Sequence, residues 1–365
     1  MKILQLHTGF NLMGGAESMI IGLANEMAKE HDVTVCSVFK PNQGSIFYTR
    51  ISENVKRVHL GVLASGFSIK NVFRIYKYLR KTDFDIIHFH GLFYYFALSI
   101  VLLHKKRKFV YTFHSDAYKE QGTWDKRIIW LKRFCLKHKW MHPVTISPQS
   151  KDSFTQYYGL DSLLIQNGIA SPKINSDSHF IDNLRITPQT KAFFHPGRIS
   201  IPKNQEVLCR VFQRLIKDGE DVMLIIAGSN QEVDIFNEIQ PMFCDRIIYL
   251  GERNDVSQLL SEADGFCLPS IWEGLPVTLL EALSVGCVPI CSPVGGIVSV
   301  VESGKNGILS QSSSEDDYYN AMRIFLRLSD SEIQTMKLAC KQSFKHYDIK
   351  ETSSKYISFF KELML

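Results

Sequence analysis

The chain has 365 residues, of which 45% are hydrophobic and 22% are charged, and its formal net charge is +5. This composition is that of a globular protein and excludes a disordered chain or a fibre, while the length favours two domains. The charge is too small to indicate a nucleic-acid partner, and the eight scattered cysteines predict reduced thiols without a disulfide framework.

The sequence shows no targeting or membrane-spanning segment. The N-terminus MKILQLHTGF lacks the features of a signal peptide. The longest apolar run, residues 92–103, is shorter than the roughly 20 residues that cross a membrane. We therefore expect a cytoplasmic protein.

Short runs rich in β-branched and aromatic residues alternate with longer amphipathic segments, which is the pattern of parallel sheets covered by helices. In the first half the predicted strands are KILQL (2–6), DVTVCSV (32–38), VKRVHL (55–60), DIIHFH (85–90), KFVYTF (108–113), HPVTIS (142–147) and LLIQN (163–167). In the second half they are AFFHPG (192–197), VMLIIAG (222–228), RIIYLG (246–251), GFCLP (265–269), VPIC (288–291) and GIL (307–309). Each half is predicted to be a doubly wound, Rossmann-like α/β domain.

The segment 169–190 is polar, contains two prolines and has no sustained hydrophobic period, so it is the predicted linker, with a boundary near residue 180. We expect an N-terminal domain over residues 1–175 and a C-terminal domain over residues 185–345. In the last segment, 348–365, apolar residues three and four apart predict an amphipathic helix.

Three predicted strand-to-helix loops carry candidate ligand-binding residues, because ligands of open parallel sheets bind at the carboxyl ends of strands. In the first, TGFNLMGGAESM, Gly14 and Gly15 open a helix. Free amides at a helix start favour an anion, and glycine lets the backbone approach it closely. A tight turn explains the two glycines equally well. The spacing is not GxGxxG, which disfavours a Rossmann oxidoreductase.

The second loop, HPGRISIPKN, contains Arg198 and Lys203. Five residues apart, they could hold both phosphates of a diphosphate, the arginine in bidentate fashion and the lysine as a point charge. Cations at a helix start are otherwise unfavourable because of the helix dipole. The simpler alternative is a pair of solvated surface charges.

The third loop begins the segment EGLPVTLLE, which runs from Glu273 to Glu281. Pro276 suits the first helical position, which leaves the amides of Val277 and Thr278 free to bind an anion. Carboxylates beside a diphosphate repel it, so their presence is explained best if they accept hydrogen bonds from sugar hydroxyls. The helix dipole alone explains Glu281 adequately and Glu273 less well.

The segments GGAE, GRxSxPKN and EGLPxxxxE, in this order and spacing, resemble the family 4 glycosyltransferases, retaining enzymes of the GT-B fold. The resemblance covers nearly the whole chain and is most specific between His195 and Gly307, which includes SPVGG. It implies two Rossmann-like domains facing each other across a cleft, with the final helix packing back on the first. It also implies metal-independent transfer of a hexosyl unit from a nucleoside-diphosphate sugar, with UDP or GDP as the nucleotide and no cofactor. The implied acceptor is a saccharide or lipid-linked saccharide in surface polysaccharide or glycolipid biosynthesis.

The resemblance also implies roles for individual residues. Arg198 and Lys203 hold the diphosphate, Glu281 binds the ribose, and Glu273 binds the transferred sugar. His114, in KFVYTFHSD, faces the donor sugar, although a lone histidine at a strand end is more often structural. The implied catalytic residues are His114, Glu273, Arg198 and Lys203. The implied donor-binding residues are Gly14, Gly15, Arg198, Lys203, Gly274, Leu275, Val277, Thr278 and Glu281.

Two patterns invite a metal site. Asp83 and Asp85 form a DxD, the metal signature of the other large glycosyltransferase fold, but they stand at the amino end of a predicted strand, on the wrong side of the sheet for a ligand. His88 and His90 share one face of that strand without a third ligand. The sequence therefore predicts no metal requirement, and His90 could instead border the acceptor.

A basic and aromatic stretch in the first domain is a candidate membrane surface. After HKKRK (104–108), it consists of Lys126, Arg127, Lys132, Arg133, Lys137, His138 and Lys139 among Trp124, Ile128, Ile129, Trp130 and Phe134. Such a surface could rest on anionic lipid at the inner face of the cell membrane, and a solvated helix face is the alternative.

Two alternatives to transfer stay open from the sequence. A GT-B nucleotide-sugar epimerase would turn over the donor without an acceptor. A non-catalytic nucleotide-sugar-binding subunit would bind the donor without turnover, and the presence of both Glu273 and His114 argues against it.

Overall fold

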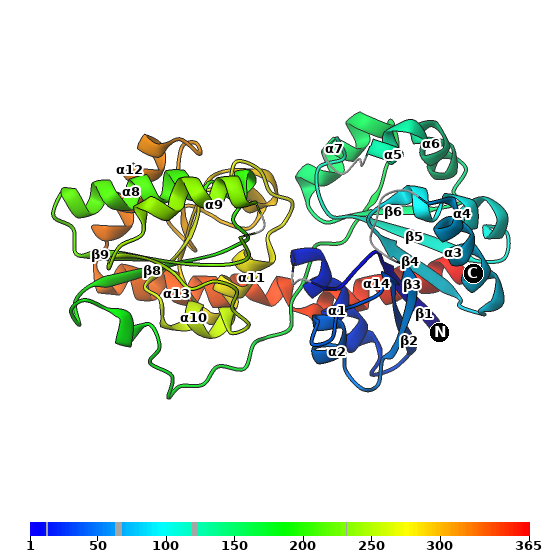
Figure 1. Cartoon of the computed structure of the whole chain (residues 1–365), viewed down its shortest axis with the longest axis horizontal. Helices are drawn as coiled ribbons and strands as arrows, with labels where there is room; N and C mark the ends of the chain where they lie inside the picture. Colours follow the sequence, from blue (N-terminus) through cyan, green and yellow to red (C-terminus); the bar gives the residue numbers. More distant parts are fainter. Residues whose placement is uncertain (12–13, 63–67, 119–122, 231) are drawn as a thin grey trace. The chain divides into compact units, whose positions relative to one another are not determined.

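The computed structural model describes residues 1–11, 14–62, 68–118, 123–230 and 232–365 (Figure 1). The chain forms two compact units. Unit 1 comprises Met1–Ala170 together with Asp348–Leu365, and unit 2 comprises Ser171–Tyr347. Each unit contains one parallel sheet with helices on both faces.

The sheet of unit 1 has seven parallel strands in the order β3-β2-β1-β4-β5-β6-β7. They are β1 (Lys2–His7), β2 (Asp32–Phe39), β3 (Lys56–Val62), β4 (Ile86–His90), β5 (Lys108–Phe113), β6 (His142–Thr145) and β7 (Leu163–Leu164). The chain adds strands on one side of β1 and then returns to add β4 on the other. The direction of winding therefore reverses between β1 and β4, and such a switch point is where open α/β sheets bind ligands.

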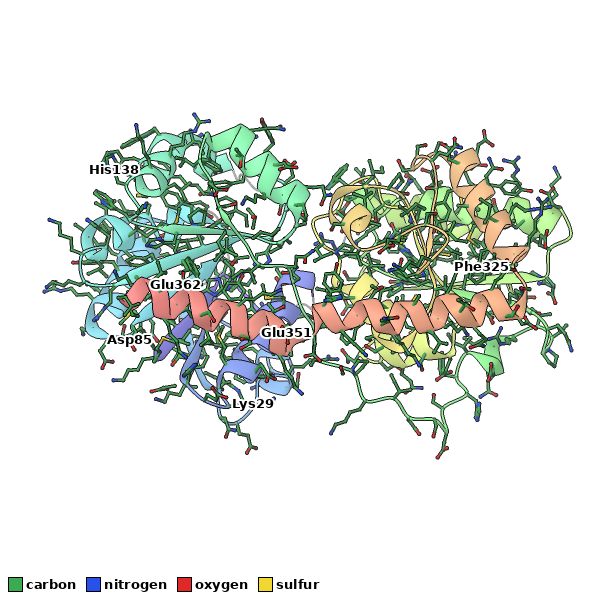
Figure 2. All side chains as sticks on the ribbon, turned by 180° about the vertical axis from the view of Figure 1, so that it is seen from behind. Lys29, Asp85, His138, Phe325, Glu351 and Glu362 are labelled. Carbon is green, nitrogen blue, oxygen red and sulfur yellow. The ribbon has the colours of Figure 1, made fainter. Side chains whose placement is uncertain are left out.

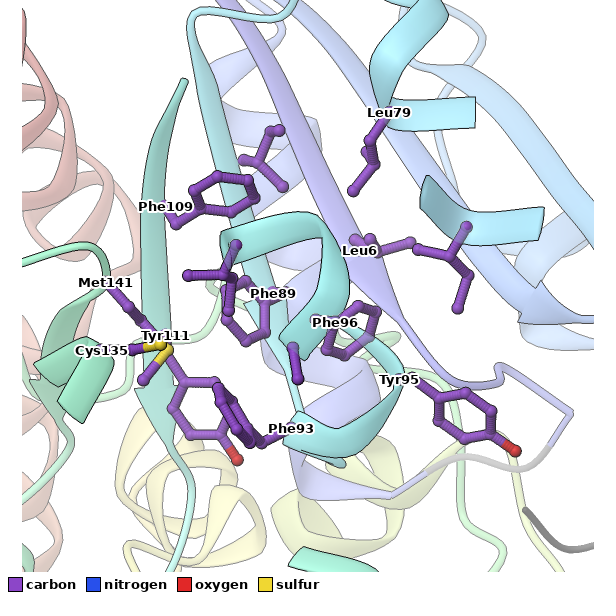
Figure 3. Packing of buried hydrophobic residues seen from close by; sticks show 14 of the residues in the cluster. Leu6, Leu79, Phe89, Phe93, Tyr95, Phe96, Phe109, Tyr111, Cys135 and Met141 are labelled. Carbon is purple, nitrogen blue, oxygen red and sulfur yellow. The ribbon is translucent and has the colours of Figure 1, made fainter. Parts of the chain in front are cut away.

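Two hydrophobic cores lie on the two faces of this sheet. One lies under α1 (Gly15–Met27), α2 (Ile46–Thr49) and α14 (Ile349–Met364). The other lies under α3 (Ile69–Lys81), α4 (Ala97–Leu103), α6 (Ile129–Lys137) and α7 (Pro148–Tyr158). Figure 3 shows rings of the second core, where Phe89 on β4 lies 4.8 Å from Phe96 and 5.0 Å from Tyr111, centroid to centroid. These contacts fix the strands whose ends carry the candidate residues of unit 1.

Helix α14 completes the first face of that sheet. Tyr356 and Phe360 are buried, and the Tyr356 hydroxyl lies 2.8 Å from the hydroxyl of Thr112 on β5. The exposed side of the same helix carries Glu351 and Glu362 (Figure 2). This two-sided pattern matches the amphipathic helix predicted for residues 348–365.

The sheet of unit 2 has six parallel strands in the order β10-β9-β8-β11-β12-β13. They are β8 (Lys191–Pro196), β9 (Val222–Ala227), β10 (Ile247–Tyr249), β11 (Gly265–Leu268), β12 (Pro289–Cys291) and β13 (Ile308–Leu309). The helices are α8 (Gln205–Lys217), α9 (Val233–Ile239), α10 (Val256–Glu262), α11 (Val277–Val285), α12 (Glu315–Leu326) and α13 (Asp330–Phe344). Figure 1 shows α8, α9 and α12 on one face, and α10, α11 and α13 pack together on the other. The switch point of this sheet lies between β8 and β11.

From Ser171 onward, the predicted linker belongs to unit 2. Ile181 is fully buried and its amide donates a hydrogen bond of 2.9 Å to Glu262 at the end of α10. Arg185 pairs with Asp264 at 2.6 Å. These contacts hold residues 171–190 against unit 2, although their polar composition resembles that of a free linker.

Every strand predicted from the sequence is present, so the doubly wound α/β class is confirmed for both halves. Strand ends differ by at most three residues, as in LLIQN, where only Leu163 and Leu164 pair with β6, and both ends of β5 are as predicted. The described residues include no helix with the length and apolar character needed to cross a membrane.

Candidate functional site

The loop after β8 is held in place by buried side chains. His195, the penultimate residue of β8, donates a hydrogen bond of 2.8 Å from Nδ1 to the carbonyl of Cys267 on β11. Its Nε2 accepts one of 3.0 Å from the amide of Gln205, which also donates to the carbonyl of Arg198 at 2.9 Å. Burial lowers the pKa of His195 to about 4, against the effect of the Cys267 bond, so the ring is neutral. Gln205 thus holds the loop that carries Arg198.

The same loop is also tied to the end of β11. Asn204 adopts the left-handed conformation with φ 57°, and its side-chain amide donates to the carbonyls of Pro269 and Ser313 at 3.1 Å each. The amide of Ile271 donates to the carbonyl of Pro202 at 2.8 Å. The ends of β8 and β11 therefore form one fixed edge at the switch point.

Lys203 and Glu273 meet at this edge. The Lys203 ammonium lies 2.6 Å from Oε1 of Glu273, and the Ser270 hydroxyl donates to the same oxygen at 2.7 Å. The side chains of Lys203 and Glu273 are only 20% and 12% exposed. Arg198 is exposed on the same loop. A partly buried ion pair with an exposed guanidinium nearby is suited to bind an anionic, hydroxyl-bearing ligand.

Two glycines allow the Glu273 backbone to sit where it does. A Cβ on Gly295, which has φ 53°, would overlap the carbonyl oxygen of Glu273. A Cβ on Gly296 would overlap the carbonyl oxygen of Gly274, which accepts a 2.6 Å hydrogen bond from the Gly296 amide. The glycines of SPVGG are therefore needed for close packing against the segment that begins with Glu273.

Helix α11 begins one residue later than predicted. Pro276 is the N-cap and not the first helical residue, because its ψ of 124° is extended. The amides of Leu279 and Leu280 donate to the Pro276 carbonyl at 3.2 and 3.4 Å. The amides of Val277 and Thr278 come before these residues in the chain, so they have no acceptor within the helix. Amides in this position are suited to bind an anion.

Gly274 and Leu275 lie between Glu273 and this helix start, and Leu275 is 4% exposed. Glu281 lies on the second turn of α11, where its Oε1 accepts a hydrogen bond of 3.3 Å from Ser257 on α10. Glu281 is only partly buried. The structure therefore groups all the predicted donor-binding residues of the second half on one edge of one unit.

The predicted site residues of the first half lie in unit 1. Gly14 is the N-cap of α1 and Gly15 its first residue, and both are exposed. A Cβ on Gly14 would overlap the carboxylate of Glu17, which pairs with His7 at 3.1 Å. Burial raises the pKa of Glu17, but the hydrogen bond to His7 and the charge of His7 together have the larger effect. The pKa of Glu17 therefore lies below its usual value. Leu12 and Met13 of the same loop lie outside the described residues.

His114 directly follows β5, at the carboxyl edge of the sheet. Its Nε2 lies 2.8 Å from Nδ1 of His90 on β4, and Nε2 of His90 lies 3.0 Å from Oε1 of Gln5 on β1. Burial lowers the pKa of His114 to about 4, with a smaller contribution from His7. The neighbouring His88 ring, on the same face of β4, instead bonds the Thr112 hydroxyl at 2.7 Å.

The DxD residues lie at the opposite edge of the sheet. Asp85 accepts a 2.8 Å hydrogen bond from the backbone amide of Lys2, and Asp83 pairs with the Lys2 side chain. Both are therefore at the amino ends of β1 and β4, away from His114. Among the described residues, no group of three or more histidine, cysteine or carboxylate side chains could hold a metal ion.

The basic stretch predicted as one surface is only partly exposed. Lys132 is fully buried, with its ammonium 4.5 Å from the centre of the Tyr111 ring and 4.8 Å from that of Phe113. Its inclusion in the surface was wrong, because α6 turns this residue toward the sheet. Trp130 and Phe134 are 66% and 42% exposed. The exposed cations of the stretch are Lys105, Lys106, Lys108, Lys126, Arg127, Arg133, Lys137 and Lys139, with His138 beside the last two.

Several residues of these edges were not singled out from the sequence. They are Gln5, His7, Glu17, Gln205 and Ser270. A usable signal exists for Gln5, since it is a polar residue within the apolar strand KILQLH. Ser270 and Gln205 have no such signal, because their contacts with Glu273, Arg198 and His195 form only when the loops at these strand ends are folded.

Known families match both halves of the chain. The model described as "Glycosyl transferases group 1" matches residues 178–340, and the model described as "Glycosyltransferase Family 4" matches residues 13–171. Together they cover most of both units, without residues 348–365 of unit 1.

Relatives and solved structures agree with this assignment. An Escherichia coli UDP-Gal:alpha-D-GlcNAc-diphosphoundecaprenol alpha-1,3-galactosyltransferase is 24% identical over 78% of this chain and 77% of its own length. A Campylobacter jejuni alpha-1,4-N-acetyl-D-galactosaminyltransferase with a diNAcBac-PP-undecaprenol-linked acceptor is 24% identical over 96% of both chains.

The structure of Anabaena HepE in complex with UDP matches with a TM-score of 0.80 and 19% identity over 99% of this chain and 100% of that one. That likeness, together with the two doubly wound sheets, establishes the GT-B fold. The chain is a glycosyltransferase and belongs to glycosyltransferase family 4.

Proposed function

We propose that the chain transfers a hexosyl unit from a nucleoside-diphosphate sugar to a lipid-linked saccharide, with retention of the anomeric configuration and without a metal ion. The observation that carries the proposal is the cluster of Lys203, Ser270 and Glu273 at the switch point of the second sheet, with Arg198 on the same loop. The two relatives described above, one with a UDP-sugar donor and both with undecaprenol-linked acceptors, support the substrate classes.

The charges of this edge fit a sugar diphosphate. Arg198 and Lys203 offer two positive charges to the phosphates, and the amides of Val277 and Thr278 add uncharged donors at a helix start. Glu273 lies 2.6 Å from Lys203, which binds the phosphate, so Glu273 accepts hydrogen bonds from hydroxyls of the transferred sugar next to that phosphate. Glu281, one helical turn further along α11, accepts hydrogen bonds from the ribose.

In the proposed reaction, the bond between the anomeric carbon and the phosphate oxygen breaks, and its electron pair stays on the diphosphate. The acceptor hydroxyl oxygen forms the new bond on the same face, and its proton passes to an oxygen of the departing phosphate. Arg198 and Lys203 stabilise the negative charge of the leaving group. Glu273 orients the sugar and stabilises positive charge on its ring, and it forms no covalent bond.

Arg198 and Lys203 supply positive charge of the kind that a divalent ion provides at other phosphate sites, which supports metal independence. His114 is proposed to contact the transferred sugar, as the family resemblance implies. The exposed Trp130 and Phe134, with cations around them on α6, support contact of this enzyme with anionic lipid, where a lipid-linked acceptor resides.

The test begins with a thermal-shift screen of UDP-, GDP- and ADP-sugars, because a ligand that binds the folded state raises the melting temperature. The stabilising donor is then incubated with an undecaprenol-diphosphate-linked saccharide in excess chelator, and NMR of the product identifies the anomer. Full transfer with the donor's configuration retained is the expected result.

Each other outcome removes a defined part of the proposal. Donor turnover without an acceptor indicates an epimerase, and donor binding without any turnover indicates a binding subunit. Activity that returns only with a divalent ion overturns metal independence, and an inverted anomer overturns retention.

A further inference from the structure

The buried hydrogen-bond chain that ends at His114 has a defined direction. It starts at Gln5, whose side-chain oxygen faces Nε2 of His90 at 3.0 Å, while its amide nitrogen faces the sulfur of Met27 at 3.7 Å. An amide oxygen only accepts hydrogen bonds, so Nε2 of His90 carries the hydrogen.

The donor in the hydrogen bond between His90 and His114 follows from the donor in the bond between Gln5 and His90. Burial holds the pKa of His90 well below its ordinary value and lowers that of His114 to about 4, so both rings are neutral and each carries one N–H. With its hydrogen on Nε2, His90 has a bare Nδ1, which lies 2.8 Å from Nε2 of His114. Nε2 of His114 must then be the donor, and Nδ1 of His114 is the bare nitrogen.

Nδ1 of His114 is buried and has no hydrogen-bond partner among the described residues, and the same is true of Nδ1 of the neighbouring His88. A buried acceptor without a partner is costly and calls for an explanation. A ligand hydroxyl would satisfy it, whereas the other tautomer would present an N–H there and could bind only an acceptor.

We propose that Gln5 and His90 are positioning residues that hold His114 in the Nε2–H tautomer, so that its Nδ1 accepts a hydrogen bond from a hydroxyl of the transferred sugar. The tautomer follows from the contacts above, and its use on the sugar rests on the proposed function. Gln5 and His90 touch no substrate themselves, because both side chains are fully buried.

A neighbouring network serves as a matched control. His88 lies on the same face of β4 as His90, with ring centroids 4.1 Å apart. It bonds the Thr112 hydroxyl at 2.7 Å, which also bonds Tyr356 at 2.8 Å. Thr112→Val therefore removes a buried polar group from the same part of the sheet without touching the chain from Gln5 to His114.

Nitrogen NMR of the histidine rings in the whole chain identifies each tautomer directly. The signals of His114 are assigned by their absence in the His114→Ala variant. The wild type is expected to show His114 and His90 with their hydrogens on Nε2. In Gln5→Met, which keeps the size of the side chain but offers no acceptor, His90 should move its hydrogen to Nδ1 and His114 should follow. Gln5→Glu, which keeps an acceptor oxygen, and Thr112→Val should both retain the wild-type pattern.

With substrate, Gln5→Met is expected to lower kcat/KM for the donor sugar about tenfold, since the ligand must then restore the disfavoured tautomer, and to leave the affinity for the free nucleoside diphosphate unchanged. Gln5→Glu should restore kcat/KM. A wild-type His114 with its hydrogen on Nδ1, or an unchanged His114 spectrum in Gln5→Met, overturns the proposal whatever the activity. A changed tautomer with unchanged kcat/KM supports the positioning role and instead removes His114 from the sugar site of the proposed function.

Discussion

Glu273 receives two hydrogen bonds on a single carboxylate oxygen, from Lys203 and from Ser270. The amide oxygen of a glutamine could accept both, so Glu273→Gln should keep the local geometry and lose only the charge. We expect kcat to fall about a hundredfold, the scale of losing one electrostatic contact to the transition state. Nucleotide affinity should stay unchanged or increase, because Lys203 no longer has a carboxylate to neutralise it.

Steady-state kinetics and calorimetric titration of the nucleoside diphosphate measure the two effects. Glu302→Gln, which alters an exposed carboxylate paired with Lys305 in the same unit, is the control. Normal transfer by Glu273→Gln would remove the assignment of Glu273 to the sugar.

Lys203→Ala should behave differently, because it removes the cation and leaves the Glu273 carboxylate facing the diphosphate unpaired. A charge-assisted hydrogen bond is worth about 1.5–3 kcal/mol, so donor affinity and turnover should both fall about ten- to a hundredfold. Lys305→Ala, at an exposed lysine of the same unit, should change neither. An unaltered dissociation constant for the nucleoside diphosphate would contradict the role of Lys203.

At the scale of elements, the structure defines which residues of α6 are exposed and could contact a membrane. Trp130 and Phe134 supply the apolar contact, and the buried Lys132 plays no part in it. We expect flotation of the protein with vesicles that contain anionic lipid, weakened by salt and by the double change Trp130→Ser and Phe134→Ser. Leu338→Ser, at an exposed apolar residue of unit 2, should float like the wild type. Equal flotation with neutral and anionic vesicles, or none with either, would refute the electrostatic contact.

The elements themselves were largely predictable from the sequence, and the side-chain pairs at their ends were not. Most strands of the two sheets are buried on both faces and read as apolar runs, whereas β3 is mostly exposed or half-buried and was predicted from its β-branched and aliphatic residues. The contact of Lys203 with Glu273 joins residues 70 apart in the chain, and no local pattern encodes it. Lys132 was misplaced because cations on a short helix look alike until the neighbouring strand shows which of them faces inward.

At the scale of the whole molecule, burial lowers the pKa of many histidines in both units. They are His31, His88, His90, His114, His142 and His195. An unfolded histidine has a pKa of about 6.5, so below that pH the unfolded chain binds more protons than the folded one. Stability must therefore fall as the pH decreases from about 7 to 5, above the range in which carboxylates titrate.

Thermal denaturation at pH 7, 6 and 5 measures this effect as a falling melting temperature. His142, whose pKa burial and the charges of Lys108 and Lys139 lower to about 4, contributes to the slope, so His142→Gln should make it shallower. A melting temperature that is constant between pH 7 and 5 would contradict the neutral state of these rings in the folded protein.

Helix α14 gives the molecule an order of assembly during synthesis. Its buried residues Tyr356 and Phe360 cover the first sheet, yet they are translated after every residue of unit 2. Unit 2 is a continuous segment and can fold as soon as it leaves the ribosome, whereas unit 1 lacks the helix that completes the sheet face already covered in part by α1 and α2. The half that begins the chain is thus the last to be finished, and a ribosome that stalls before residue 349 releases a chain in which the apolar surface normally covered by α14 is exposed to chaperones and proteases.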